Sequence, residues 1–120
     1  MSAGAPAVDS AALDRLRESV GDEFLGKLVG TFLDDAPVQL TTLRGAFERG
    51  DTEEALRAAH TLKSNGATFG AEGLSELCRE LEKKARARDL AEAGELISRA
   101  EAEYARVEGA LTALRGGGSS

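Results

Sequence analysis

The chain has little of several residue types that stabilise small proteins or build their chemical sites. It contains one cysteine, one histidine, two prolines and no tryptophan among 120 residues. A single cysteine excludes an internal disulfide. Together with one histidine it cannot supply the three or four nitrogen and sulfur ligands of a zinc site, and no loop of carboxylates typical of a calcium cage is present. We therefore expect this protein to bind no metal of its own.

Basic residues are also outnumbered. Lysine and arginine total 15 against 21 aspartates and glutamates, a formal net charge of −6. Nucleic-acid affinity rests largely on cations that neutralise phosphates, so we expect a protein partner and no nucleic acid. The chain shows no secretory signal and no apolar run of membrane-spanning length. The sequence therefore predicts a soluble cytoplasmic protein, with its thiol reduced and no membrane association.

Signals for β-strands are missing as well. No window alternates convincingly with period two, whereas apolar residues recur at helical spacing almost throughout. A composition of 42% hydrophobic and 30% charged residues with few aromatics suits a helical bundle. Short connections favour antiparallel neighbours, so we predict one all-α, up-and-down bundle over residues 9–115. Residues 1–8 are expected to be disordered and 116–120 to form a flexible tail.

Caps, glycines and prolines indicate the helix boundaries. A short first helix is expected over residues 10–19. The second is expected to end near Asp35, because Pro37 disfavours a helical conformation for the residue before it, with a kink or a break at that point. The helical pattern then continues to Gly50, a good C-terminal stop, and Asp51 begins the next helix with a capping-box-like start.

Apolar stripes predict which faces of the three later helices are buried. The helix after Asp51 has a narrow stripe at Ala55, Ala59, Leu62, Gly66 and Phe69. The next helix has one at Leu74, Leu77, Cys78, Leu81 and Ala85. The last helix, expected to start at Asp89, carries two seven-residue series, Leu90, Ile97, Tyr104, Leu111 and Ala93, Ala100, Val107, Leu114. This regular repeat predicts a scaffold helix or a dimer seam.

His60 is the one residue to which the pattern draws attention. It lies one position beyond the buried stripe of its helix, so its side chain points away from the core. Residues three and four positions apart on a helix are neighbours, which places Leu56, Lys63 and Ser64 beside it. On this evidence alone an exposed histidine is more often an ordinary solvated residue than a functional one.

The sequence around His60 resembles a known family. The run over residues 58–85 reads AAHTLKSNGATFGAEGLSELCRELEKKA, and the run over residues 32–51 reads FLDDAPVQLTTLRGAFERGD. Both are similar to histidine-containing phosphotransfer (HPt) domains of bacterial two-component phosphorelays. The family has a His-x-Leu-Lys-small motif followed at fixed distance by a Phe/Leu-Gly-Ala segment. The resemblance covers roughly residues 9–114.

The resemblance implies a fold and a set of roles. The fold is a four-helix bundle with a short extra N-terminal helix, and His60 carries the phosphoryl group. Lys63 matches the family's lysine near the phosphoryl oxygens. Ser64 matches a family position where a small residue gives a partner access to the histidine. Glu82 matches a position where Glu or Gln on the next helix orients the histidine ring. The alternative for Glu82 is a surface carboxylate without a special role.

Elementary chemistry supports these roles. Histidine has an ordinary pKa of about 6.5, so near neutral pH one ring nitrogen is a usable nucleophile. A carboxylate that accepts from Nδ1–H would leave the Nε2 lone pair facing outward, and a lysine would offset the phosphoryl charge. The chain has no ATP-binding glycine loop, so we expect a carrier without autonomous kinase activity or cofactor. The resemblance places Mg²⁺ on the partner receiver domain.

The resemblance also implies partners, namely response-regulator receiver domains and a hybrid sensor kinase. A docking surface needs an apolar centre with a polar rim. We predict that it involves Leu13, Leu16, Phe24, Leu28, Thr61, Ser64 and Asn65. Two other functions remain open: a non-phosphorylated adaptor bundle that binds a receiver or kinase, and the phospho-accepting domain of a chemotaxis-type kinase.

Overall fold

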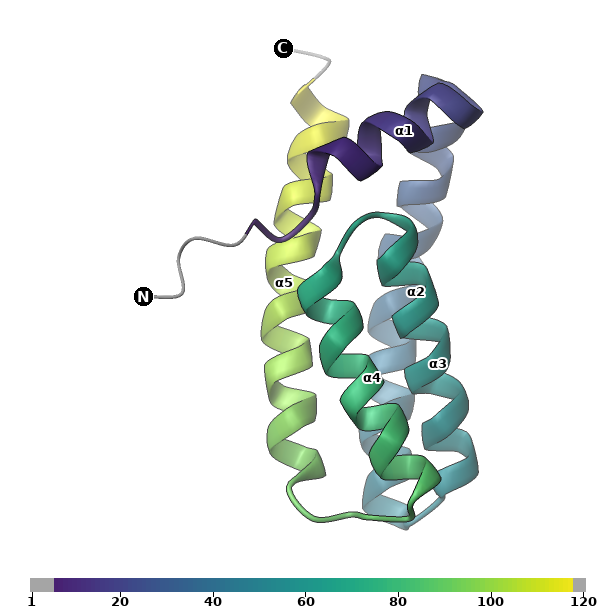
Figure 1. The fold of residues 1–120 in the computed structure, drawn as a ribbon, viewed down its shortest axis with the longest axis vertical. Coiled ribbons are helices and arrows are strands. Elements are labelled where there is room, and N and C mark those ends of the chain that lie inside the picture. The colour runs from purple at the N-terminus through teal and green to yellow at the C-terminus, as the bar shows by residue number, and fades with distance from the viewer. Residues whose placement is uncertain (1–5, 118–120) are drawn as a thin grey trace.

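The computed structural model describes residues 6–117, and this part of the chain consists of helices and their connections. Figure 1 shows the long helices running side by side and the short N-terminal helix lying across their upper end. The prediction of an all-α, antiparallel four-helix bundle with an extra N-terminal helix is confirmed. The helices are α1 (Ser10–Val20), α2 (Asp22–Arg49), α3 (Thr52–Thr68), α4 (Glu72–Arg86) and α5 (Ala93–Gly117).

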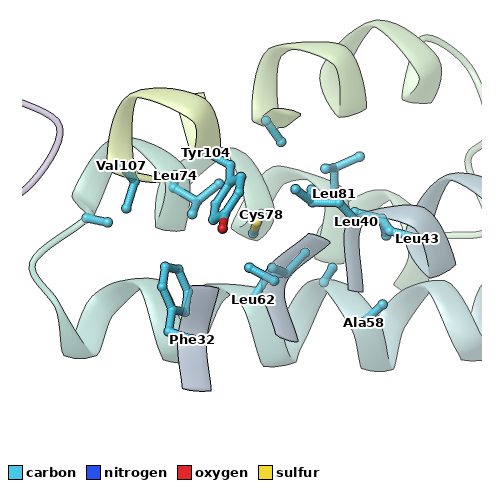
Figure 2. Packing of buried hydrophobic residues seen from close by; sticks show 14 of the residues in the cluster. Phe32, Leu40, Leu43, Ala58, Leu62, Leu74, Cys78, Leu81, Tyr104 and Val107 are labelled. Atoms are coloured by element: carbon cyan, nitrogen blue, oxygen red, sulfur yellow. The ribbon is translucent and has the colours of Figure 1, made fainter. Parts of the chain in front are cut away.

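The core is apolar and draws on every helix. The stripe predicted for α3 is buried in full, and it faces the buried side of α4. Figure 2 shows Leu62 of α3 opposite Leu74, Cys78 and Leu81 of α4, with Phe32 and Tyr104 beside them. Burying one such side chain contributes about 1.5–3 kcal/mol, so the stripe strongly favours a single rotation of α3 about its axis. That rotation sets the direction of every other α3 side chain.

The second helix does not end near Asp35, and this prediction was wrong. α2 continues without interruption through Pro37 to Arg49. Proline has no N–H to donate to the carbonyl of Leu33, four residues earlier. The hydroxyl of Tyr104, on α5, donates to that carbonyl at 3.3 Å instead. Burial raises the pKa of Tyr104 to about 12, so the phenol keeps the proton that this bond requires.

The last helix begins at Ala93, four residues later than predicted. The Asp89 carboxylate accepts from the backbone N–H of Ala91 at 3.0 Å, a local bond that competes with helix formation. Arg88 and Glu92 on either side adopt the left-handed conformation, with φ of 56° and 61°. Leu90 is consequently 47% exposed in the connection and is not part of the α5 seam.

The N-terminal segment is ordered further back than predicted. Ala7 is buried and Val8 packs partly against the core, although both fall in the segment expected to be disordered. The backbone N–H of Asp9 donates to the carbonyl of Gly70 at 2.9 Å, which ties the start of α1 to the α3–α4 connection. At the other end, residues 116 and 117 belong to α5 rather than to a tail. Residues 1–5 and 118–120 lie outside the described part.

The bond from Tyr104 to the proline-freed carbonyl can be tested by a double-mutant cycle. We expect Tyr104→Phe to lower the free energy of unfolding by about 1 kcal/mol, because the carbonyl of Leu33 loses its donor. In a Pro37→Ala background the restored N–H satisfies that carbonyl, so the same change should cost much less. Urea denaturation measures both. Equal costs in the two backgrounds would show that the hydroxyl does not compensate for the proline.

Gly70 provides a second test of the fold. Its φ is +71°, and a Cβ placed there would lie 2.9 Å from the Cβ atoms of both Asp9 and Ala12. Gly50 has a similar φ of +74°, but a Cβ added there would meet nothing within 4 Å, so it is a matched control for backbone strain alone. We expect Gly50→Ala to lower the free energy of unfolding by about 1–2 kcal/mol. Gly70→Ala should lower it clearly more, because α1 must also shift. Equal losses in thermal unfolding would mean that α1 does not pack there.

Candidate functional site

His60 lies on the exposed side of α3, halfway along the helix. Asp51 caps the start of this helix, because its carboxylate accepts from the backbone N–H of Glu54 at 3.1 Å. Ala59 and Leu62 on either side of the histidine are buried, so the imidazole faces outward and its side chain is 60% exposed. The predicted exposure of His60 is confirmed.

Glu82 of α4 lies directly beside the histidine ring. Its carboxylate oxygen Oε2 is 3.0 Å from Nδ1 of His60, and its side chain is only 6% exposed. The alternative of a solvated surface carboxylate is therefore wrong. The two helices are held in register close by, where the hydroxyl of Ser75 donates to the backbone carbonyl of Lys63 at 3.1 Å.

Two cations bind the same carboxylate. Nζ of Lys63 lies 2.6 Å from Oε1 of Glu82, and Nη2 of Arg86 lies 3.3 Å from Oε2. Arg86 was not predicted from the sequence. Its spacing of four residues from Glu82 on one helix was the available signal, but Arg86 falls within a basic run at the helix end that is typical of a solvated terminus.

These donors keep the carboxylate ionised. Burial by itself raises the pKa of Glu82, but hydrogen bonds from Lys63 and His60, together with the charge of Lys63 and that of His60 when its ring is protonated, outweigh it and lower the pKa overall. An ionised carboxylate only accepts hydrogen bonds, so Nδ1 of His60 must carry the proton between them. In the neutral form of the ring the lone pair is then on Nε2, and no group within residues 6–117 hydrogen-bonds that nitrogen.

Cys78 carries the only thiol of the chain, and the structure excludes it as a nucleophile. Its side chain is fully buried, and burial, with a smaller effect from the charge of Glu82, raises the pKa of the thiol to about 12. The thiol is protonated and inaccessible at neutral pH, and the thiolate is the reactive form.

The predicted docking residues do not form one surface. Leu13 is 5% exposed and belongs to the core, so its assignment to a docking surface was wrong. Leu16 and Leu28 are half-buried against the core. Phe24 is 51% exposed, but at a rise of about 1.5 Å per residue it lies about 24 Å from His60 along the bundle axis.

The predicted docking residues on α3 are better placed. Ser64 is exposed one turn after His60, and Thr61 and Asn65 are half-buried.

Gly66, on the buried stripe of the same helix, would place a Cβ 3.6 Å from the carbonyl oxygen of Ala71. That is an ordinary contact, so the packing does not require glycine at this position.

The described residues offer neither a metal site nor a membrane span. No group of three or more histidine, cysteine, aspartate or glutamate side chains within residues 6–117 is arranged to hold a metal ion. None of the helices in this range is both long and apolar enough to cross a membrane.

Comparison with known proteins shows the family. Residues 27–116, most of the chain, match the Hpt domain family, and the chain belongs to it. It is therefore a histidine-phosphotransfer domain of the kind used in phosphorelays. Its structure is similar to the crystal structure of histidine-containing phosphotransfer protein B (HptB) from Pseudomonas aeruginosa PAO1. The TM-score is 0.87 at 34% identity, over 93% of this chain and 96% of that one. No curated protein matches the chain in sequence.

The shared carboxylate leads to a prediction about pH. Because the folded-state pKa of Glu82 is lowered, its stabilisation is present above the ordinary value of 4.5 and is lost as the pH falls through the folded-state value. We expect Glu82→Gln to be less stable than the wild type at pH 7, and the difference in unfolding free energy to narrow below about pH 4.5.

Glu80→Gln is the matched control, since Glu80 is an exposed carboxylate on the same helix. The unfolding free energy of this variant should differ little from that of the wild type across the same range of pH. A gap between wild type and Glu82→Gln that does not change with pH would contradict the lowered pKa of Glu82.

Proposed function

We propose that this protein accepts a phosphoryl group on Nε2 of His60 from the aspartyl phosphate of a receiver domain and passes it to another receiver. The observation that carries this proposal is the contact between the exposed imidazole and the nearly buried, ionised carboxylate of Glu82. That contact orients the ring and leaves its second nitrogen free to react. Family membership and the likeness to HptB support the same activity.

The transfer of the phosphoryl group requires no proton acceptor, because no proton leaves the imidazole. The Nε2 lone pair attacks phosphorus, the P–O bond to the aspartyl carboxylate breaks as the N–P bond forms, and the carboxylate leaves with the electron pair. The ring keeps its Nδ1 proton and gains positive charge, which the Glu82 carboxylate stabilises through the 3.0 Å contact. Transfer to the next receiver reverses these steps.

The remaining residues around His60 complete the proposal. Lys63 holds Oε1 of Glu82 and places its charge one turn from the phosphoryl group. Ser64 is small and exposed, which gives a partner access to Nε2. In this proposal the receiver domain supplies Mg²⁺. This chain acts as a phosphoryl carrier in the cytoplasm and has no kinase activity of its own. A hybrid sensor kinase would stand at the start of such a relay.

His60→Gln tests the acceptor directly. Incubation with a phosphorylated receiver domain should label the wild type with an acid-labile, base-stable phosphate and leave the variant unlabelled. The imidazole is mostly exposed but donates to Glu82, so we expect the variant to remain folded with a free energy of unfolding lowered by about 1 kcal/mol. Phosphate on the folded variant would contradict the assignment to His60. No transfer to the wild type from a panel of receivers would favour the adaptor or the kinase-domain alternative.

A further inference from the structure

The surface around His60 is rich in cations although the protein as a whole is acidic. On α3, Arg57 and Lys63 lie one turn before and one turn after the histidine. On α4, Arg79 and Arg86 lie one turn before and one turn after Glu82. The contacts from Glu82 to His60 and Lys63 bring these two stretches side by side. A chain with a net charge of −6 therefore presents positive side chains at its candidate site.

Most of these cations already have a carboxylate partner. Lys63 and Arg86 both bind Glu82, and Arg79 pairs with Glu76 at 3.3 Å. Arg57 is exposed, and its guanidinium makes no ion pair or hydrogen bond with any group in residues 6–117. Among the four side chains it alone keeps its full charge and all its donors available.

The position of Arg57 allows it to reach a group on the imidazole. Residues three apart on a helix have Cβ atoms about 5–6 Å from each other, and both side chains point to the same exposed side. A guanidinium stays protonated and presents a planar set of donors that fits phosphoryl oxygens bidentately. A phosphoryl group on Nε2 would bring about two negative charges to this surface.

We propose that Arg57 binds the oxygens of the phosphoryl group on His60 and is a positioning residue for phosphotransfer. This inference rests on the proposed function. Lys63 and Arg86 are occupied in keeping Glu82 ionised, and Arg57 offsets the charge that arrives with the phosphoryl group. Its role differs from docking, because it requires only the phosphoryl group and no surface of a partner protein.

A small-molecule phosphoryl donor separates binding of the phosphoryl group from binding of a partner. Phosphoramidate transfers its phosphoryl group to Nε2 as its P–N bond breaks and ammonia leaves with a proton from water. We expect phosphoramidate to phosphorylate Arg57→Ala about tenfold more slowly than the wild type. With a phosphorylated receiver domain as the donor, the rate should fall by a similar factor. Arg57→Lys should recover part of the rate, because it keeps the charge but not the planar donors.

Arg99→Ala is the matched control, since Arg99 is an exposed cation on α5 without an ion pair in the described residues. It changes the net charge equally and should leave both rates unchanged. Phosphorus-31 NMR of phosphorylated protein gives an independent readout. Loss of a bound cation in Arg57→Ala should raise the pKa of the phosphoryl group, which a purely structural role would not do.

The possible outcomes are distinct. A defect of Arg57→Ala with the receiver but not with phosphoramidate would overturn the assignment to the phosphoryl group and place Arg57 in partner recognition. Unchanged rates and an unchanged phosphoryl pKa would overturn the inference and leave the proposed function intact. Failure of the proposed function would look different, because the wild type itself would then form no phosphohistidine with any receiver domain, whatever its reaction with phosphoramidate.

Discussion

Burial of the Glu82 carboxylate is the constraint from which the arrangement of the site follows. A nearly buried charge is tolerated only when it is paired and hydrogen-bonded, and here three donors from two helices surround it. Satisfying Glu82 ties α3 to α4 in one register and fixes the orientation of the His60 ring. Removing one partner of such a group usually costs more than an exposed ion pair contributes, because the remaining charge is left without compensation.

The scaffold gives that pair of helices a rigid support. Phe32 packs against Phe69 and Tyr104, with ring centroids 5.1 and 5.9 Å apart, and joins α2, α5 and the end of α3 in one aromatic cluster. The hydroxyl of Tyr104 also satisfies the carbonyl that Pro37 leaves without its helical donor. Rigid elements suit a carrier whose reaction depends on the placement of one nitrogen, because phosphoryl transfer is catalysed mainly by positioning and electrostatics.

Charge is distributed unevenly between the body of the protein and its site. The net charge is acidic, yet the cations on α3 and α4 surround the histidine, and Glu82 neutralises only part of them. An uncompensated cation at an exposed site favours an anionic group over solvent, whereas the acidic remainder disfavours nucleic acid. The electrostatics of the surface thus match a phosphoryl group carried between proteins.

The amino-acid sequence alone determined the features that depend on neighbours along the chain. The period of the α3 stripe predicted its buried face and hence the exposure of His60, and Asp51 predicted its beginning. The pairing of His60 with Glu82 was expected only through the family motif, because periodicity places each residue on its own helix and says nothing of the facing one.

Only the tertiary structure decided the features that depend on contacts distant in sequence. α2 continues past Pro37, where a hydroxyl from α5 donates to the freed carbonyl, and Leu13 is buried because α1 packs across the end of the bundle. The contact of Arg86 with Glu82 was also not predicted, because a basic residue at a helix end is usually solvated. Local patterns encode which face of a helix is apolar, but the donors and acceptors that meet across helices are set by packing.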